Sequence, residues 1–337
     1  MPDSSGFDRR TLAKIGVGFL AAVMLVYLAG WVVGWNRILS TLAGANYWWV
    51  ALGCLSSTAC LVVWAKAWDE VLDVLDVSIP YRALIVTYFA ATFADYVTPF
   101  GKVGGNPFIA YLLSQDDRIS YEESLAGIVT ADLLNLVPFF VFSGVGLAAL
   151  SLFGSVPSAA KPLIGGLSVV AVAVPLSVYG TYQYRNAFES VLTTLLSPVA
   201  SWVDSVDVDS IRQRLEEFYA RIDRIASHRG VLVSTLSYSF VGWLFFALPL
   251  YLAGQAVGVH IDPLLVLFLV PASSLAGIAP TPGGVGGIVV VLAALMVALV
   301  PMKPSTAAAV ALLYRVASYW FVIAISGIAT FYEIYRA

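Results

Sequence analysis

Six apolar runs dominate the sequence, and each is long enough to cross a lipid bilayer. They lie near residues 12–35, 46–68, 120–152, 161–182, 230–257 and 304–332. A helix rises about 1.5 Å per residue, so about 20 apolar residues cross the hydrocarbon core. Hydrophobic residues make up 60% of the chain and charged residues 12%, whereas soluble domains average roughly 45–50% and 25%. The sequence therefore predicts an all-α polytopic membrane protein with about six full transmembrane helices.

Two further apolar segments stop too early to cross the membrane. The stretch 82–97 ends at a segment rich in Gly and Pro, 98–107, and the stretch 263–279 ends at a similar segment, 280–287. Proline removes a backbone donor and glycine permits positive φ, so neither helix continues. Because unpaired backbone is costly in lipid, such breaks are tolerated only against protein or a water-filled cavity. We predict two re-entrant helical hairpins, each of which enters and leaves the membrane on one side.

The two breaks resemble each other, which indicates an internal repeat. Thr98-Pro-x-Gly-x-Val-Gly-Gly in the first matches Thr281-Pro-x-Gly-Val-Gly-Gly in the second. Asp132 follows the first threonine at the same spacing at which Arg315 follows the second. Inverted repeats with broken helices are typical of transporters, whose substrate binds where the breaks meet. Two unrelated kinks that serve packing alone are the alternative.

This repeat divides a single predicted membrane domain, residues 1–337, into four parts. The parts are a first helix (1–45), repeat 1 (46–152), a connecting helix with a cytoplasmic amphipathic loop (153–229), and repeat 2 (230–337). Repeat 1 starts outside and repeat 2 starts inside. The two units are therefore expected to be related by an axis in the membrane plane.

The distribution of basic residues sets the orientation. Of the 18 Lys and Arg residues, this map places 13 on one side, three on the other and two, Lys102 and Arg315, within the membrane. Cytoplasmic loops carry the excess of basic residues. We therefore expect a plasma-membrane protein with both termini and the loop 183–229 in the cytoplasm. The net charge of −3 argues against nucleic acid as a partner.

Arg315 lies deep in an apolar run, where a charge needs a partner or a function. Its planar guanidinium suits phosphate oxygens, which favours an anionic headgroup as its ligand. A purely structural pair with Asp132 is the alternative. The residues expected to bind substrate are Arg315, Asp132, Asn135, Asp95, Lys102, Thr98, Gly104, Gly105, Asn106, Thr281, Gly283, Gly284, Gly286 and Gly287.

The sequence contains none of the common catalytic or cofactor motifs. It shows no nucleophile elbow, P-loop, HExxH or dinucleotide fingerprint. Two cysteines and two histidines are too few and too scattered for a metal site. We expect no catalytic residue, no metal and no cofactor, and therefore a protein that is not an enzyme.

Two further patterns concern the surface. Tyr and Trp residues cluster at the span ends, Trp68 and Tyr319 among them, and are interpreted as an interfacial belt. Within the polar loop, apolar residues recur at helical spacing over 207–228. We expect an amphipathic helix on the inner membrane surface, with contact to a partner protein as the alternative.

Nearly the whole chain resembles the flippase-like transmembrane family of the lysylphosphatidylglycerol synthases. Residues 105–113 fill its first motif, residues 280–289 its second, and Tyr314-Arg315 its later Tyr-Arg pair. Three polar positions depart from the family pattern: Asn106 replaces Glu, Ile109 replaces Arg and Val289 replaces Glu. The resemblance is to a stand-alone member without the soluble aminoacyl-transfer domain, so it does not imply lysyl transfer.

Together these features predict a lipid translocase without its own ATP site. It would move an anionic or glycosylated lipid between leaflets, with the headgroup sheltered where the breaks meet. Asp95 and Asp132 are the candidates for carrying a coupled proton or ion. A membrane-embedded lipid-modifying or glycosylation accessory protein, and a non-transporting scaffold, are the alternatives.

Overall fold

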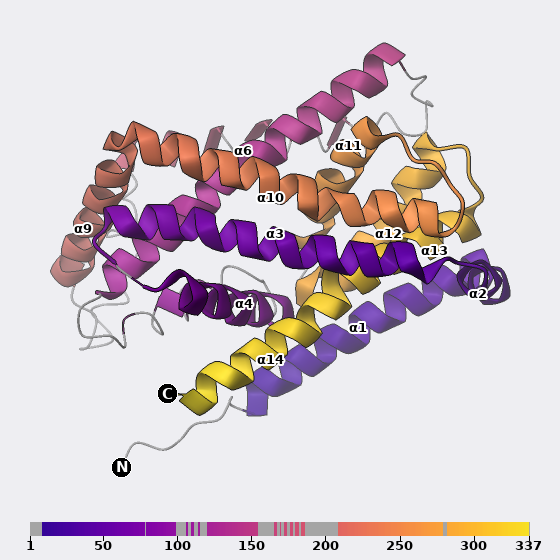
Figure 1. The fold of residues 1–337 in the computed structure, drawn as a ribbon, viewed down its shortest axis with the longest axis horizontal. Coiled ribbons are helices and arrows are strands. Elements are labelled where there is room, and N and C mark those ends of the chain that lie inside the picture. Colours follow the sequence, from indigo (N-terminus) through magenta and orange to yellow (C-terminus); the bar gives the residue numbers. More distant parts are fainter. Residues whose placement is uncertain are drawn as a thin grey trace.

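A computed structural model describes residues 9–77, 79–98, 120–153, 208–278 and 282–336, with single positions between 106 and 114 and between 165 and 185. These residues form helices, and no strand occurs among them (Figure 1). The main elements are α1 (Arg9–Val33), α2 (Trp35–Ala43), α3 (Tyr47–Val74), α4 (Tyr81–Val97), α6 (Tyr121–Phe153), α9 (Val208–Ser227), α10 (Arg229–Ala256), α11 (Pro263–Ser274), η2 (Leu275–Ile278), η3 (Pro282–Gly284), α12 (Val285–Leu299), α13 (Pro304–Arg315), η4 (Val316–Trp320) and α14 (Phe321–Arg336). The predicted all-helical class is confirmed.

Four of the described helical stretches are long and apolar enough to span a membrane. They are Tyr47–Val74, Tyr121–Leu150, Arg229–Ala256 and Pro304–Tyr332. A fifth results if Val23–Val33 and Trp35–Ala43, which meet at 95°, form one bent span. The predicted run 161–182 lies largely outside the described residues. The count of six crossings and two re-entrant hairpins therefore stays a prediction.

Side-chain caps fix where three of the helices begin. The Asn46 side chain accepts a hydrogen bond from the Trp48 amide at the start of α3. The Asp262 side chain accepts one from the Leu264 amide at the start of α11. Ser120 and Glu123 bond each other's amide at 3.1 Å, which is a capping box at the start of α6. These caps satisfy backbone donors that a helix end leaves open.

The helix bounds recur between the two halves of the chain. Helices α3 and α10 each have 28 residues. Helix α6 and the combined stretch α13–η4–α14 are equally long. Their first residues are separated by the same number of positions as Thr98 and Thr281, which begin the two breaks. The short helices α4 and α11 occupy equivalent places between them. This correspondence in element order and length favours a two-unit organisation.

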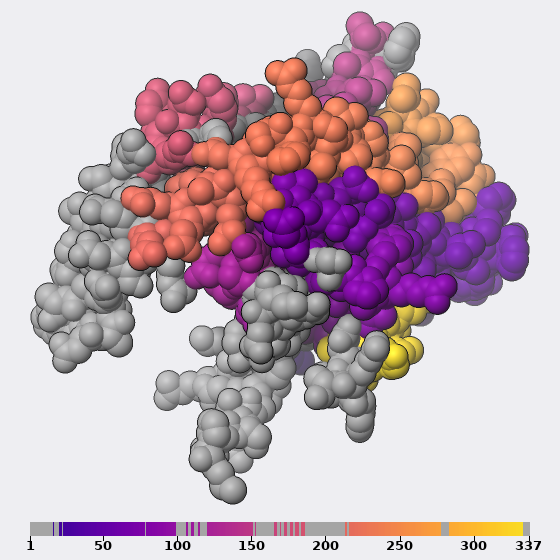
Figure 2. Space-filling view, turned by 60° about the vertical axis from the view of Figure 1, so that its left-hand side comes forward, coloured from indigo at the N-terminus to yellow at the C-terminus, as the bar shows by residue number. Residues whose placement is uncertain are grey.

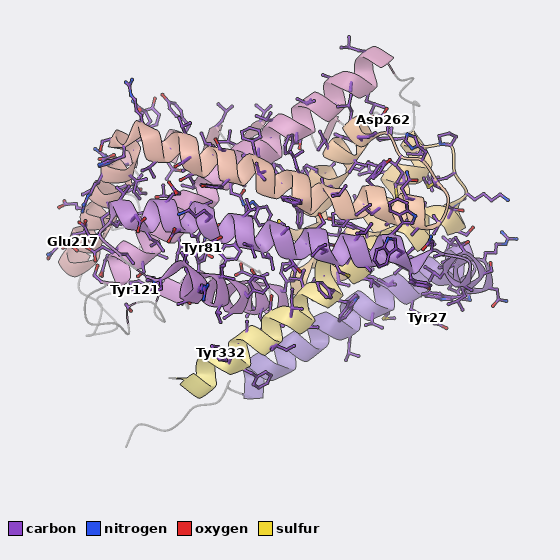
Figure 3. All side chains as sticks on the ribbon, in the orientation of Figure 1. Tyr27, Tyr81, Tyr121, Glu217, Asp262 and Tyr332 are labelled. Carbon is purple, nitrogen blue, oxygen red and sulfur yellow. The ribbon has the colours of Figure 1, made fainter. Side chains whose placement is uncertain are left out.

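Helices α3 and α10 pack antiparallel along their lengths (Figures 1 and 2). The Asn46 amide before α3 donates to the Ala256 carbonyl at the end of α10 at 2.8 Å. At the other end, Ser234 donates to Glu70 at 2.7 Å. Figure 3 shows Glu217 and Asp262 at opposite ends of this pair. The two units therefore run in opposite directions.

The short helix of each unit packs against a long helix of the other unit. The first short helix, α4, packs on α14 of the second unit, and α11 packs on α6 of the first unit (Figure 1). Gly146 permits the second contact, because a Cβ there would lie 2.8 Å from the Leu264 carbonyl oxygen. Each of these long helices thus packs against the short helix of the other unit.

Large apolar side chains cover much of the outer surface, including Trp31, Val32 and Trp48. Such a surface suits lipid rather than water. Two residues interpreted as members of an interfacial belt are placed differently. Trp68 is 5% exposed and Tyr319 is fully buried, so the belt interpretation is wrong for both. Their rings instead pack against tyrosines from α4, Tyr88 and Tyr96.

Candidate functional site

The second break is held in a left-handed backbone conformation. Gly283 has φ 54° and Gly284 has φ 60°, which side chains other than glycine rarely adopt. A Cβ at Gly283 would collide with the Tyr319 ring. A Cβ at Gly287, in the first turn of α12, would lie 2.9 Å from the Ala276 carbonyl oxygen. The glycines of this break therefore allow both the turn and the close packing around it.

The Arg315 side chain binds the backbone of this break. Its Nη2 donates to the Gly283 carbonyl at 2.8 Å. Its guanidinium carbon lies 4.4 Å from the centre of the Tyr319 ring, a cation–π contact. The residue is 4% exposed, and its Nε has no hydrogen-bond partner among the residues that the structure describes. Among the described residues, this buried, charged donor is therefore unsatisfied.

Tyr319 joins the second break to the end of the first. It lies in η4, a π-helical turn that follows Arg315, and such turns often occur at functional sites. Its hydroxyl donates to the Tyr96 carbonyl at 3.1 Å, and the two rings stack 5.2 Å apart. Helix α4, which ends one residue before Thr98, also contacts η3. The start of the first break therefore lies against the second.

Asp132 is the counterpart of Arg315 in the first unit and also binds its own unit's break. Its Oδ2 accepts a hydrogen bond from Asn106 Nδ2 at 2.9 Å. Within the described ranges, no ion pair joins Asp132 to Arg315. The structure thus shows two separate tethers at equivalent positions, where the sequence left open a direct pair.

A narrow cleft lies beside Asp132, among α3, α4, α6 and α10, and it is too tight to admit a water molecule. It is lined by Trp64, Ala67, Trp68, Tyr88, Ala131, Asp132, Asn135 and Ser239. The Asn135 carbonyl accepts a hydrogen bond from Trp243 Nε1 at 2.9 Å. This cleft brings together two predicted site residues, Asp132 and Asn135, and four polar or aromatic residues that were not predicted as site residues.

Three polar atoms of the cleft residues have no partner among the described residues. They are Trp64 Nε1, Asn135 Oδ1 and Ser239 Oγ, and all three atoms are buried. Gly242 makes room for the indole, because a Cβ there would collide with Trp64. Buried polar atoms are normally hydrogen-bonded. Three unpartnered polar atoms therefore lie around one closed cleft of an otherwise apolar bundle.

The remaining predicted site residues fall into three groups. Gly284 and Gly286 are buried at the second break, beside Gly283 and Gly287. Asp95 lies in the last turn of α4, and the Thr98 hydroxyl donates to the Ala94 carbonyl at 2.7 Å. The other predicted positions, Lys102, Gly104, Gly105 and Thr281, lie outside the described residues.

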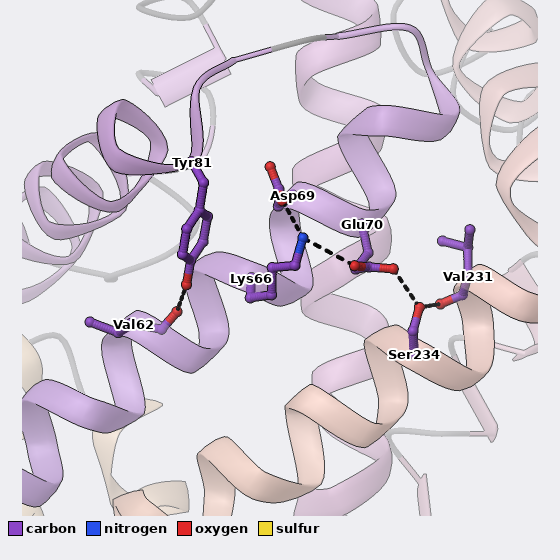
Figure 4. Close-up of polar contacts among 7 residues, drawn as sticks. All are labelled: Val62, Lys66, Asp69, Glu70, Tyr81, Val231 and Ser234. Carbon is purple, nitrogen blue, oxygen red and sulfur yellow. Dashed lines mark hydrogen bonds and ion pairs between the residues drawn. The ribbon is translucent and has the colours of Figure 1, made fainter.

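A second polar cluster joins α3, α4 and α10 away from the breaks (Figure 4). Lys66 forms ion pairs with Asp69 and Glu70, and Glu70 accepts a hydrogen bond from Ser234 at 2.7 Å. The Tyr81 hydroxyl donates to the Val62 carbonyl at 2.7 Å. Because these groups satisfy one another, the cluster fixes helix positions rather than offering open donors.

The amphipathic helix predicted at 207–228 is observed as α9, and it packs on α6. Arg221 pairs with Glu123 at 2.6 Å, and Arg224 pairs with Asp76 at 2.7 Å. Ile225 is fully buried. Part of the apolar face therefore lies against the chain's own helices. Contact of α9 with the membrane surface or with a partner protein stays a prediction.

Comparison with known proteins gives one family and several relatives. The family described as "Lysylphosphatidylglycerol synthase TM region" matches residues 13–326. The UPF0104 membrane protein PH1989 of Pyrococcus horikoshii is 25% identical over 92% of this chain and 94% of its own. A UPF0104 membrane protein of Methanothermobacter thermautotrophicus is 24% identical over 92% of this chain and 91% of its own. The glycosyltransferase AglD of Haloferax volcanii is 24% identical over 89% of this chain and 51% of its own.

Proposed function

The chain belongs to the lysylphosphatidylglycerol synthase transmembrane family, and from this premise we propose that it moves an anionic or glycosylated lipid between the leaflets of a membrane. The proposal assigns the chain no catalytic step and no cofactor. The headgroup would cross along the region where the broken segments of the two units meet, while the lipid chains stay in the bilayer.

The meeting of the two breaks is the observation that carries this proposal. The end of α4 contacts η3, and Tyr319 binds the Tyr96 carbonyl across the contact. Irregular backbone at membrane depth is tolerated where it is packed in protein or lines a cavity. Transporters with inverted repeats bind substrate where their broken helices come together. The packing of α3 on α10, and of each short helix on the other unit, has that symmetry.

Arg315 is the group that we propose to attract a charged headgroup. It is buried, and its Nε has no partner among the described residues. The first turn of α12 follows the same break, and a helix N-terminus favours anions. In the structure, the Gly283 carbonyl and the Tyr319 ring hold the guanidinium in place. A phosphate oxygen would gain a charged hydrogen bond that these neighbours do not supply.

Proteoliposomes with lipids labelled on the acyl chain by the fluorophore NBD test this function. Dithionite, which does not cross the bilayer, bleaches the outer leaflet, and a translocase makes the inner-leaflet label accessible too. Phosphatidic acid, a glucosyl diacylglycerol and phosphatidylcholine supply anionic, glycosylated and zwitterionic headgroups. Movement of either of the first two by the wild-type protein supports the proposal, and a protected pool unchanged for all three contradicts it.

Two arginine variants connect this movement to the site. Arg315→Lys keeps the charge but loses the planar fork. We expect it to slow the transfer of phosphatidic acid by about tenfold or more, the size of a lost hydrogen bond to a charged group. Arg229→Lys, at an exposed position in the first turn of α10, is the matched control and should leave the rate unchanged. Equal rates for both variants would remove Arg315 from the mechanism.

The likeness to AglD favours a second candidate, an accessory role in lipid glycosylation. A protein called a glycosyltransferase shares about half of its length with this chain. On this reading the chain would hold a lipid for a separate enzyme without moving it. Binding of the glucosyl lipid to the purified protein, with no change in dithionite protection, would support the accessory role over the translocase.

We also propose a plasma-membrane location with both termini in the cytoplasm. Cysteines introduced at Arg229 and Asp262, which are exposed near the two ends of α10, should label from opposite sides of intact cells. Cys54 and Cys60 would first be replaced by serine. Labelling of the Arg229 position from outside would reverse the orientation.

A further inference from the structure

The chain bends sharply where α1 ends and α2 begins. The two helices meet at 95°, and Gly34 between them has φ 97°, which glycine adopts without strain. Trp35 holds the bend, because its Nε1 donates to the Tyr27 carbonyl at 3.2 Å. Its indole lies where Gly30 has no side chain, since a Cβ there would collide with the ring. Specific residues therefore fix the angle between the two helices.

Helix α2 lies across the end of the helix bundle, at the end opposite α9 (Figure 1). Ile38 of this helix is 1% exposed, and α2 packs on α13. Asn36 and Arg37 are exposed instead. A short helix at right angles to a spanning helix, with an apolar side on the protein and a polar side outward, is placed to lie in the headgroup layer of a membrane.

A groove of about 510 Å³ follows this bend. We call it the bend groove, and it is lined by Trp31, Val32, Val33, Gly34, Trp35, Asn36 and Arg37. Its volume lies within the range of small-molecule sites, about 300–1,000 Å³. Because Trp31 is 71% exposed and Val32 78% exposed, a lipid can enter it from the side.

The two arms of the bend differ in chemistry. The last turn of α1 contributes the apolar Trp31 and Val32, and the first turn of α2 contributes the polar Asn36 and Arg37. A phospholipid is divided in the same way, with apolar chains that run along spanning helices and a phosphate at the headgroup level. Tryptophan is also common at that level. The bend groove therefore matches a lipid that places its chains along α1 and its phosphate beside α2.

Arg37 gives the bend groove a preference for negative charge. Its planar guanidinium suits phosphate oxygens, and no ion pair among the described residues involves it. None of the residues that line the bend groove is acidic, so no carboxylate opposes an anion. A choline or ethanolamine headgroup would instead bring a positive charge close to the arginine. The lining thus favours a lipid with a net negative headgroup.

We propose that the bend groove binds one anionic phospholipid from the leaflet opposite α9, with Arg37 on its phosphate and Trp31 and Val32 along its chains. None of these residues belongs to the predicted substrate site. The proposal goes beyond the proposed function, because it concerns a lipid held at the edge of the bundle, and it does not depend on whether the protein moves lipid.

Photolabelling in mixed micelles tests this site by its location. The probe is phosphatidylglycerol with a diazirine on the acyl chain, and mass spectrometry of fragments locates the label on the purified protein. Unlabelled phosphatidylglycerol, phosphatidylcholine and glycerol 1-phosphate are added as competitors. We expect labelling of the stretch 31–37 that phosphatidylglycerol displaces, and that equal amounts of the other two leave in place.

A matched pair of arginine variants tests the role of the charge. Arg37→Gln should raise the concentration of phosphatidylglycerol that displaces half of the label by about fivefold or more, the effect of one basic residue beside anionic lipid. Arg229→Gln is the control, because Arg229 is exposed at the other end of the bundle, where α10 begins, and it should match the wild type. Thermal unfolding in detergent checks that both variants fold like the wild type.

Four results would overturn the proposal. Absence of label from 31–37 would mean that no lipid occupies the bend groove. Equal displacement by phosphatidylcholine would mean a contact that any lipid makes, and displacement by glycerol 1-phosphate would mean a site for free phosphate. Equal behaviour of Arg37→Gln and Arg229→Gln would remove Arg37 as the ligand. Since none of these measurements follows lipid movement, they leave the proposed function to its own test.

Discussion

Replacing Gly283 by alanine should destabilise the protein more than any ordinary surface change. The backbone has φ 54° there, and the new Cβ would enter the Tyr319 ring. A left-handed conformation costs a residue other than glycine about 1–2 kcal/mol, and overpacking adds about 1–3 kcal/mol. The free energy of unfolding should therefore fall by roughly 2–5 kcal/mol. The displaced Gly283 carbonyl would also lose its alignment with Arg315.

Unfolding by SDS in mixed micelles, followed by tryptophan fluorescence, measures this change. Gly144→Ala is the matched control, because Gly144 lies within α6 and a Cβ there meets no atom within 4 Å. Alanine is the better helix former by about 0.5–1 kcal/mol, so the control should unfold at the same SDS fraction or a higher one.

The reasoning is refuted if Gly283→Ala and Gly144→Ala unfold together. That result would mean that the second break has room for a side chain and that Tyr319 does not close it. Transfer of phosphatidic acid gives an independent test. If the Gly283 carbonyl no longer positions Arg315, the variant protein should also transfer an anionic lipid more slowly.

Three further predictions follow from single contacts. Gly146→Ala should lower the free energy of unfolding by about 1–3 kcal/mol in the SDS titration, since its Cβ would press on the backbone of α11; an unchanged midpoint would show that α6 and α11 are not in close contact. Tyr319→Phe should cost only about 0.5–1.5 kcal/mol in that titration, because it removes the hydroxyl bonded to Tyr96 and leaves the rings stacked; a much larger loss would mean that the hydroxyl has another role. Arg221→Ala should cost about 1 kcal/mol or less, as expected for a partly exposed pair with Glu123, and high salt should reduce the difference from wild type; a cost that salt leaves unchanged would point to packing instead.

Helix positions could be read from the sequence because they depend on local features. Long apolar runs and Gly/Pro breaks predicted stretches at 46–68, 82–97, 230–257 and 263–279, and the structure places α3, α4, α10 and α11 over them. The offset between the two breaks also reappears in the bounds of the long helices. The amphipathic stripe predicted α9 in the same way.

The cleft beside Asp132 could not be predicted from the sequence, because it depends on pairing between distant helices. Ser239 and Trp64 lie in opposite halves of the chain and meet only when α10 lies antiparallel on α3. Each is ordinary alone: serine is tolerated in membrane helices, and tryptophan at a span end suggests an interfacial belt. A signal was nevertheless available, since Gly242 leaves space on α10 for a large ring.

The partner of Arg315 was missed for a related reason. A search for an opposite charge leads to Asp132, whereas the guanidinium binds the Gly283 carbonyl and the Tyr319 ring. Every residue has a backbone carbonyl, so the identity of a residue does not indicate that its carbonyl accepts a hydrogen bond from an arginine. Only the left-handed turn at Gly283 presents that carbonyl to the arginine.

Lipid movement by single copies of the protein in large vesicles tests the central claim most directly. The wild-type chain is reconstituted at decreasing protein-to-vesicle ratios with the glucosyl lipid or phosphatidic acid labelled on the acyl chain, and dithionite is added. A translocase predicts that the protected label disappears in every vesicle that holds a copy and persists only in vesicles without one. If vesicles that demonstrably contain the folded protein keep their inner-leaflet label for both lipids, the chain does not move lipid of either class.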